Sequence, residues 1–176
     1  MSATDVTVSP FAGSSGWYPR RVSAEANKRL VRRYFQAIEA ADYPAIEGLL
    51  AEQVRFWLPP SVPDGATLQN RGDVMRNIRE SIAGLYDTRV GLHPEIVNLT
   101  AEEDRVAAEL VIRGRAKASG ADYENHYHFL FVIRGGKIAE FHEHLDTLYA
   151  FRALFEPAGI VAPEDVTWMP DASGSD

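Results

Sequence analysis

The chain has 176 residues, of which 45% are hydrophobic and 24% are charged, as is typical of a single folded domain. Its formal net charge of −7 argues against nucleic-acid binding, because phosphates attract basic surfaces. The absence of cysteine excludes disulfides, thiolate metal sites and cysteine nucleophiles.

Residues 1–22 are rich in Ser, Gly and Pro and lack periodicity, so we expect a flexible N-terminal arm. They also lack the charged start and apolar stretch of a secretory signal. No apolar run in the chain approaches the roughly 20 residues of a membrane span. We therefore expect a cytoplasmic protein that does not bind membranes.

Three amphipathic helices are predicted in the first half of a domain that spans residues 23–156. Ser23 is a plausible N-cap for the first helix, and Asp42 precedes a short second helix. The third helix is predicted over Gly72–Leu85. The first helix has apolar residues at steps of three and four: Leu30, Val31, Tyr34, Phe35 and Ile38.

A period of two then predicts strands. Val54–Leu58 reads as a strand that ends at two prolines, and a loop is expected from there to Arg71. Four further strands should form an antiparallel meander: Thr88–Leu99, Arg105–Ala116, Tyr123–Arg134 and Lys137–Leu145. A last helix is predicted over Leu148–Phe155, capped by Asp146 or Thr147.

This order of elements predicts an α+β fold in which three helices pack over the concave face of a curved antiparallel sheet. Such a sheet, closed by helices on one side, forms a cone with an apolar interior suited to a small ligand. The tail over residues 157–176 is acidic and contains proline, so we expect little order there.

The hairpin around Gly135 and Gly136 determines which side chains face the cone. A two-residue turn would pair Glu143 with His128, whereas a three-residue turn with a glycine bulge would pair it with Tyr127. We favour the second register, because it gathers one set of side chains on a single face: Asn125, Tyr127, Phe129, Phe141, Glu143 and Leu145.

Three segments of the chain resemble the NTF2-like superfamily, in its SnoaL-like branch. They are the opening helix VRRYFQAIEAADYPAIEGLLAEQVRFWLPP, the helix that begins RGDVM, and the hairpin containing GKIAEFHEHLDT. The resemblance covers roughly residues 24–156, and His144 replaces the tyrosine that is usual in the last segment. It implies the cone fold and an inward-facing Glu143, but it does not define an activity, because this fold hosts several.

Three enzyme groups with this fold match the chain only in part. Tyr34 matches the oxyanion-binding tyrosine of ketosteroid isomerases, whereas their catalytic aspartate falls near Leu58. Glu143 matches an acidic residue of limonene-epoxide hydrolases, whereas their Arg and Asp fall near Leu110 and Ile112.

Phenazine-biosynthesis A/B proteins share a similar Tyr-Glu-Asn-His segment and a glutamate that matches Glu143. Their histidine on the third helix falls near Asn77 or Ile78 and is absent here. Each set of catalytic residues is therefore partly present and none is complete.

Glu143 is the first candidate for a catalytic residue, because a carboxylate in an apolar pocket can act as acid or base near neutral pH. Tyr127 and Tyr34 could donate hydrogen bonds to an oxygen that gains charge. Further ligand contacts are expected from one amide, one arginine and several large side chains: Asn125, Arg55, Trp57, Phe129, Phe141 and Leu145. For Arg55 and Trp57 this requires that their side of the strand faces the cone.

Four histidines lie on the other face of the same hairpin. In the favoured register His128 would face His142, and His126 would face His144. Such a set could bind a divalent metal ion, or it could lie at a homodimer interface formed by the sheet and make assembly pH-sensitive. We favour the interface.

The sequence thus predicts a cone-shaped domain that binds a small, largely apolar molecule of polyketide, steroid or terpenoid type. The first hypothesis is cofactor-free acid–base catalysis through Glu143, of isomerase, cyclase or hydrolase type. The second is a carrier protein without chemistry, and the third is a metal site on the histidine hairpin.

Overall fold

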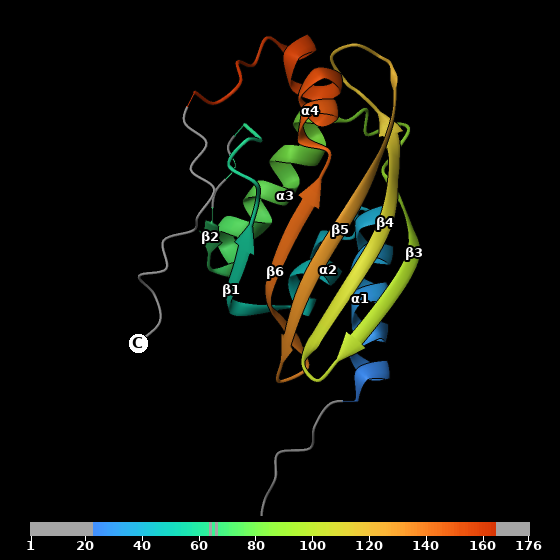
Figure 1. Cartoon of the computed structure of the whole chain (residues 1–176), viewed down its shortest axis with the longest axis vertical. Helices are drawn as coiled ribbons and strands as arrows, with labels where there is room; N and C mark the ends of the chain where they lie inside the picture. Colours follow the sequence, from blue (N-terminus) through green and yellow to red (C-terminus); the bar gives the residue numbers. More distant parts are fainter. Residues whose placement is uncertain (1–22, 64, 66, 165–176) are drawn as a thin grey trace, which may run out of the picture.

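The computed structural model describes residues 23–63, 65 and 67–164. The predicted N-terminal arm and the end of the predicted tail lie outside these residues. In the described part, helices cover one face of a curved six-stranded sheet, and the other face of the sheet is turned toward the viewer (Figure 1). This is the predicted α+β arrangement.

Three helices precede the meander, as predicted: α1 (Ala24–Glu39), α2 (Tyr43–Leu49) and α3 (Arg71–Leu85). Each has a side-chain N-cap, because an oxygen of Ser23, Asp42 or Asn70 accepts a backbone N–H of the first turn. Tyr34 and Phe35 are buried on α1, in agreement with its apolar spacing.

The sheet has the order β2-β1-β6-β5-β4-β3. The strands are β1 (Leu50–Trp57), β2 (Thr67–Gln69), β3 (His93–Glu102), β4 (Arg105–Arg115), β5 (Asp122–Arg134) and β6 (Lys137–Leu145). The last four form the predicted antiparallel meander, but β1 pairs parallel with β6. This parallel pair adds β1 to the predicted meander, and the sequence did not predict it.

Several boundaries differ from the prediction. Strand β1 starts four residues earlier, directly after α2, and the short β2 lies within the predicted loop. Strand β3 starts only at His93, because the Asp87 carboxylate accepts the Arg89 N–H at 3.0 Å and holds a turn. The last helix is divided into α4 (Thr147–Ala150), a π-helical turn over Phe151–Phe155 and a 3₁₀ turn over Glu156–Ala158. Among the described residues, α4 is thus a fourth α-helix in addition to the three that were expected over the sheet.

A β-bulge at Ala139 sets the register of the last hairpin. Next to the two-glycine turn, Ile133 pairs with Ile138, but Val132 already pairs with Glu140, so Ala139 is an extra residue. As a result Glu143 pairs with Phe129, and neither predicted register was correct. The favoured register nevertheless put Glu143 on the correct face, because it differs from the observed one by two residues.

Phenylalanine rings fill the space between the helices and the sheet. Phe141 is fully buried and stacks on Phe56 with ring centroids 4.3 Å apart. Phe131 lies 5.8 Å from Phe141 on its other neighbouring strand, and the Tyr34 ring of α1 contacts both. This packing joins β1, β6, β5 and α1, and the cavity described next adjoins it.

Candidate functional site

A cavity of about 350 Å³ lies between the helices and the inner face of the sheet, a volume that suits a small organic molecule. Its walls come from α1, β1, α3, β4, β5 and β6, and the segment that contains Ala150, Leu154 and Phe155 contributes to it as well. Most of the lining side chains are apolar. The polar ones include Tyr34, Asn77, Ser81, Tyr86, Tyr127 and Glu143.

Glu143 brings a carboxyl group to this cavity from β6. The Glu143 side chain is half-buried, and the part of it that remains accessible faces the cavity. Among the described residues, no hydrogen bond or ion pair satisfies its carboxylate. Burial alone raises the pKa of Glu143 from 4.5 to about 7, since a desolvated carboxylate without a partner favours the neutral form. Near neutral pH both forms are therefore populated.

Tyrosines surround this carboxyl group. Tyr34 and Tyr127 both line the cavity, as predicted, and burial raises the pKa of each hydroxyl, with a further contribution from the charge of Glu143. Both hydroxyls therefore keep their protons at physiological pH and can act as hydrogen-bond donors. Phe129 and Leu145, also predicted, form apolar parts of the wall.

Tyr127 belongs to a buried hydrogen-bonded cluster. Its hydroxyl lies 2.7 Å from that of Tyr123, and the Asn125 side-chain amide donates to the Tyr123 hydroxyl at 3.0 Å. The same amide donates to the backbone oxygen of Asp146 at 3.1 Å. Asn125, which was predicted as a ligand contact, is buried and is not part of the cavity wall.

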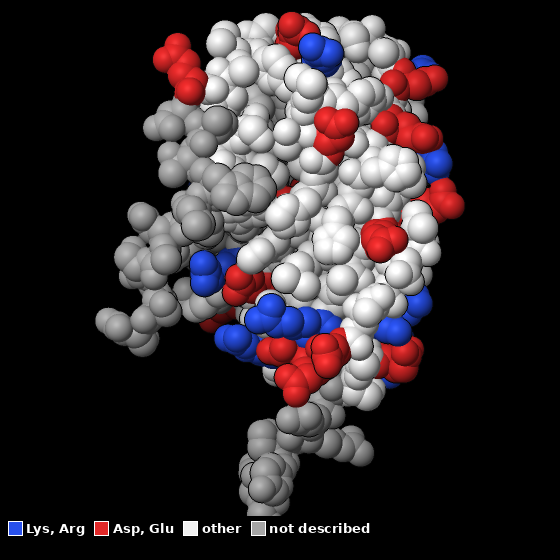
Figure 2. Space-filling model, in the orientation of Figure 1, with Lys and Arg blue, Asp and Glu red and all other residues white. Residues whose placement is uncertain are grey.

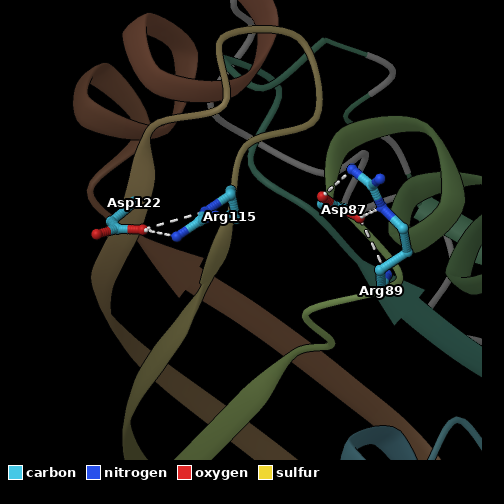
Figure 3. Close-up of polar contacts among 4 residues, drawn as sticks. All are labelled: Asp87, Arg89, Arg115 and Asp122. Atoms are coloured by element: carbon cyan, nitrogen blue, oxygen red, sulfur yellow. Dashed lines mark hydrogen bonds and ion pairs between the residues drawn. The ribbon is translucent and has the colours of Figure 1, made fainter.

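Tyr86 reaches the same cluster from the end of α3. It forms an isolated β-bridge with Ala116, and the Asp87 N–H donates to the Arg115 backbone oxygen at 2.8 Å. Two ion pairs flank this junction, Asp87 with Arg89 and Arg115 with Asp122 (Figure 3). The hydrogen bonds from Arg89 lower the pKa of Asp87 to about 2, so this turn keeps its charge over the physiological range.

Three other predicted ligand contacts lie outside the cavity wall. Trp57 is on the opposite face of the sheet, where its ring lies 4.9 Å from that of His144. Arg55 shares that face and lies 4.0 Å from Glu140. It is Phe56 and Leu58, on the alternate side of the strand, that line the cavity. Phe141 faces the interior but is covered by Phe56 and Phe131.

Sequence reasoning missed Tyr86, Tyr123 and Asn77 as site residues. Tyr123 shares the alternating face of Asn125 and Tyr127, so the strand pattern could have identified it. Tyr86 follows the last turn of α3 and gives no periodic signal. Asn77 lies on the cavity side of α3 at one of the two positions compared with the histidine of the phenazine-biosynthesis proteins.

The histidines lie on the outer face of the sheet, but in a different pairing from the prediction. His128 is opposite His144, and His142 is opposite Leu130 and hydrogen-bonds Glu140 at 2.6 Å. Within residues 23–63, 65 and 67–164, no three His, Asp or Glu side chains are placed together to hold a metal ion. Over the same residues, no helix is both long and apolar enough to cross a membrane.

The chain belongs to the SnoaL-like domain family, whose model matches residues 31–141. That match runs from the middle of α1 to the middle of β6, so it includes the cavity residues Tyr34, Tyr86 and Tyr127 and ends two residues before Glu143. The predicted membership is thereby confirmed. A search of curated proteins found no match to this chain.

Solved structures share the fold at low sequence identity. An NTF2-like protein from Burkholderia xenovorans is 20% identical, with 76% of this chain and 98% of that one covered at a TM-score of 0.62. A protein provisionally assigned as a polyketide cyclase from Xanthomonas campestris is 21% identical, with 74% and 97% covered at 0.64. An LEH-like epoxide hydrolase from M. tuberculosis is 14% identical, with 77% and 94% covered at 0.59. The predicted NTF2-like fold is confirmed.

Proposed function

We propose that this protein binds a small, largely apolar organic molecule of polyketide, steroid or terpenoid type in the cavity and that Glu143 moves a proton of that molecule. The proposal rests on one observation: the Glu143 carboxyl group faces an apolar cavity, and burial raises its pKa to about 7. A group with such a pKa can accept or give a proton at neutral pH without a large energetic cost.

The surrounding tyrosines complete the proposed chemistry. Proton removal next to a carbonyl group, or opening of an epoxide, places negative charge on an oxygen of the substrate. Tyr127 and Tyr34 reach the cavity as protonated donors and would stabilise that oxygen. The names of the similar structures, a polyketide cyclase and an epoxide hydrolase, are consistent with this reaction class. The chemistry needs no cofactor.

The variant Glu143→Gln tests the role of the carboxyl group. Suitable probes are a β,γ-unsaturated ketosteroid, whose isomerisation needs proton transfer, and a terpene epoxide, whose hydrolysis needs an activated water. We expect kcat on the accepted probe to fall by roughly 10²- to 10⁴-fold, the usual contribution of a general acid or base. The dissociation constant of the probe should change little, because Gln preserves the shape of the side chain. An unchanged kcat would remove Glu143 from the mechanism.

One observation favours the second candidate, a carrier protein. Among the described residues, Glu143 has no hydrogen-bonded partner that would orient it or a water molecule, as an enzyme site commonly requires. Native mass spectrometry of the purified protein, before and after mild denaturation, tests this alternative. A retained organic molecule that the wild-type protein binds but does not convert would support a carrier, and its conversion would support the enzyme.

A further inference from the structure

The chain of hydrogen bonds behind the cavity wall has a direction. It runs from Asn125 through Tyr123 to Tyr127, with contacts of 3.0 and 2.7 Å. Tyr127 lines the cavity, whereas the other two residues are buried and do not reach its wall. The order of donors along this chain decides what Tyr127 can offer to a ligand.

The Asp146 backbone carbonyl fixes the orientation of the Asn125 amide. A carbonyl oxygen can only accept, so the amide atom 3.1 Å from it must be the NH₂ nitrogen. The same NH₂ group lies 3.0 Å from the Tyr123 hydroxyl and donates its second proton there. In the flipped orientation two oxygens would face each other at hydrogen-bond distance, which is repulsive.

Tyr123 is therefore an acceptor toward Asn125 and has one proton left to donate. Its contact with Tyr127, at 2.7 Å, has the length of a well-formed O–H···O hydrogen bond. The Tyr86 hydroxyl is a competing acceptor for both protons, because side-chain hydrogen bonds with Tyr123 and with Tyr127 affect the pKa of Tyr86. With the Tyr123 proton on Tyr127, the proton of Tyr127 is shared between Tyr86 and an acceptor oxygen in the cavity.

We propose that Tyr127 donates a hydrogen bond to a carbonyl oxygen of the ligand, and that Asn125 and Tyr123 are positioning residues that fix this direction. The inference rests on the proposed function in one respect, that the cavity is the ligand site. Each bond of the chain polarises the next, so Tyr127 is a stronger donor than an isolated tyrosine. The proposed ligands are thereby narrowed to apolar molecules that place an acceptor oxygen next to the Tyr127 hydroxyl.

Ring packing holds Tyr123, the middle residue of the hydrogen-bonded chain, in place. The Tyr123 ring contacts Tyr86 edge-on and stacks on Tyr149 of α4, with ring centroids 5.5 Å apart in each case. Removing only the Tyr123 hydroxyl should therefore leave the ring where it is. The substitution Tyr123→Phe interrupts the chain without a change in shape, and it leaves the Tyr127 hydroxyl in the cavity wall.

The experiment uses 1-acetonaphthone carrying ¹³C in its carbonyl group, and infrared difference spectra of the bound ketone. A carbonyl that accepts a hydrogen bond absorbs at lower frequency than the same carbonyl in hexane. We expect the lowest frequency in the wild-type protein, a value near that of hexane in Tyr127→Phe, and an intermediate value in Tyr123→Phe. Tyr127→Phe should also weaken ketone binding roughly 2- to 12-fold, as expected for one neutral hydrogen bond. Tyr43→Phe on α2, which lies outside the cavity wall, is the matched control and should keep the wild-type band.

Three results would overturn the inference. The first is that the wild-type protein binds the ketone no more tightly than it binds 1-ethylnaphthalene. The second and third are that the carbonyl frequency of the bound ketone in Tyr127→Phe, or in Tyr123→Phe, is the same as in the wild-type protein. The role of Glu143 is tested separately, because Glu143→Gln should keep the low-frequency band whether or not it loses turnover.

Discussion

Burial of Glu143 couples the stability of the protein to pH. Its pKa is about 7 in the folded protein and near 4.5 when it is exposed, so between these values the folded state binds a proton that the unfolded state has released. The free energy of unfolding attributable to this group therefore falls as pH rises from about 4.5 to about 7, and it is constant outside that window. The shift corresponds to about 3 kcal/mol.

Glu143→Gln should remove this dependence. We expect the variant to match the wild-type protein in stability at pH 4 and to exceed it by about 3 kcal/mol at pH 8, since the amide has no charge to desolvate. Urea unfolding at both pH values measures the difference. Glu109→Gln, which removes an exposed glutamate from β4, controls for the loss of one negative charge. A difference between wild type and variant that is equal at the two pH values would contradict the raised pKa.

The residues of the site differ in how far the sequence could predict them. Strand alternation placed Tyr127 and Glu143 on one face, and that face is the inner one. For β1 the alternation left two possible faces, and the choice of Trp57 over Phe56 was wrong because only tertiary packing decides it. Tyr86 could not have been predicted, since its position depends on a single bridge to Ala116.

At the level of elements, the N-cap of α4, Asp146, connects the hydrogen-bonded chain of Asn125, Tyr123 and Tyr127 to the cavity wall. The Asp146 carboxylate accepts the Tyr149 N–H at 3.0 Å, and its backbone oxygen accepts from Asn125. Helix α4 and the π-helical turn after it supply Ala150 and Leu154 to the cavity. Loss of this cap should therefore affect ligand binding as well as stability.

Asp146→Ala should destabilise the fold by about 1 kcal/mol, the usual value of an N-cap, and weaken ketone binding several-fold. Asp42→Ala removes an equivalent cap, also at 3.0 Å, from α2, which does not reach the cavity. The control should lose similar stability without weaker binding. Thermal unfolding and a ketone titration of both variants measure the two effects. Equal effects on binding would show that the cap of α4 has no special link to the cavity.

For the whole molecule, we propose that the outer face of the sheet packs against a second copy of the chain. Figure 2 shows this face as largely uncharged in its centre, with scattered acidic residues and basic ones gathered near its lower end. Val97 is 61% exposed there, beside a groove lined by His126, His128 and His144. The surface of the groove is mostly apolar, and an apolar patch rimmed by polar residues marks an interaction site.

Val97→Glu should therefore convert a homodimer to a monomer, because the new carboxylate would be buried at the interface without a partner. Val90→Glu places the same charge at another exposed valine, in the turn after Asp87, and should leave assembly unchanged. Sedimentation velocity measures the molecular mass of each protein. A monomeric wild type, or a dimer that persists in Val97→Glu, would contradict this assignment of the face.

The overall architecture was the most predictable level. The helical periods, the four-strand meander and the family resemblance led to the observed layers, because each depends on local pattern. The parallel pairing of β1 with β6 was missed, since the two strands are more than 75 residues apart and no local signal links them. Long-range pairing of this kind is decided by the packing of the whole domain.

The bulge at Ala139 has a consequence for the comparison of related chains. Side chains alternate between the two sides of a strand, and the extra residue allows Ile138 and Phe141, which are three positions apart, both to face the interior. A relative that lacks one residue at this point would form a regular hairpin with the counterpart of Glu143 still facing the cavity, because Ile138 and Glu140 already pair with adjacent residues of β5. If the same residues instead paired without a bulge, the counterpart of Glu143 would face the outer surface and that of His142 or His144 the cavity, so the bulge decides whether the ionisable group of the site is a carboxylic acid or an imidazole.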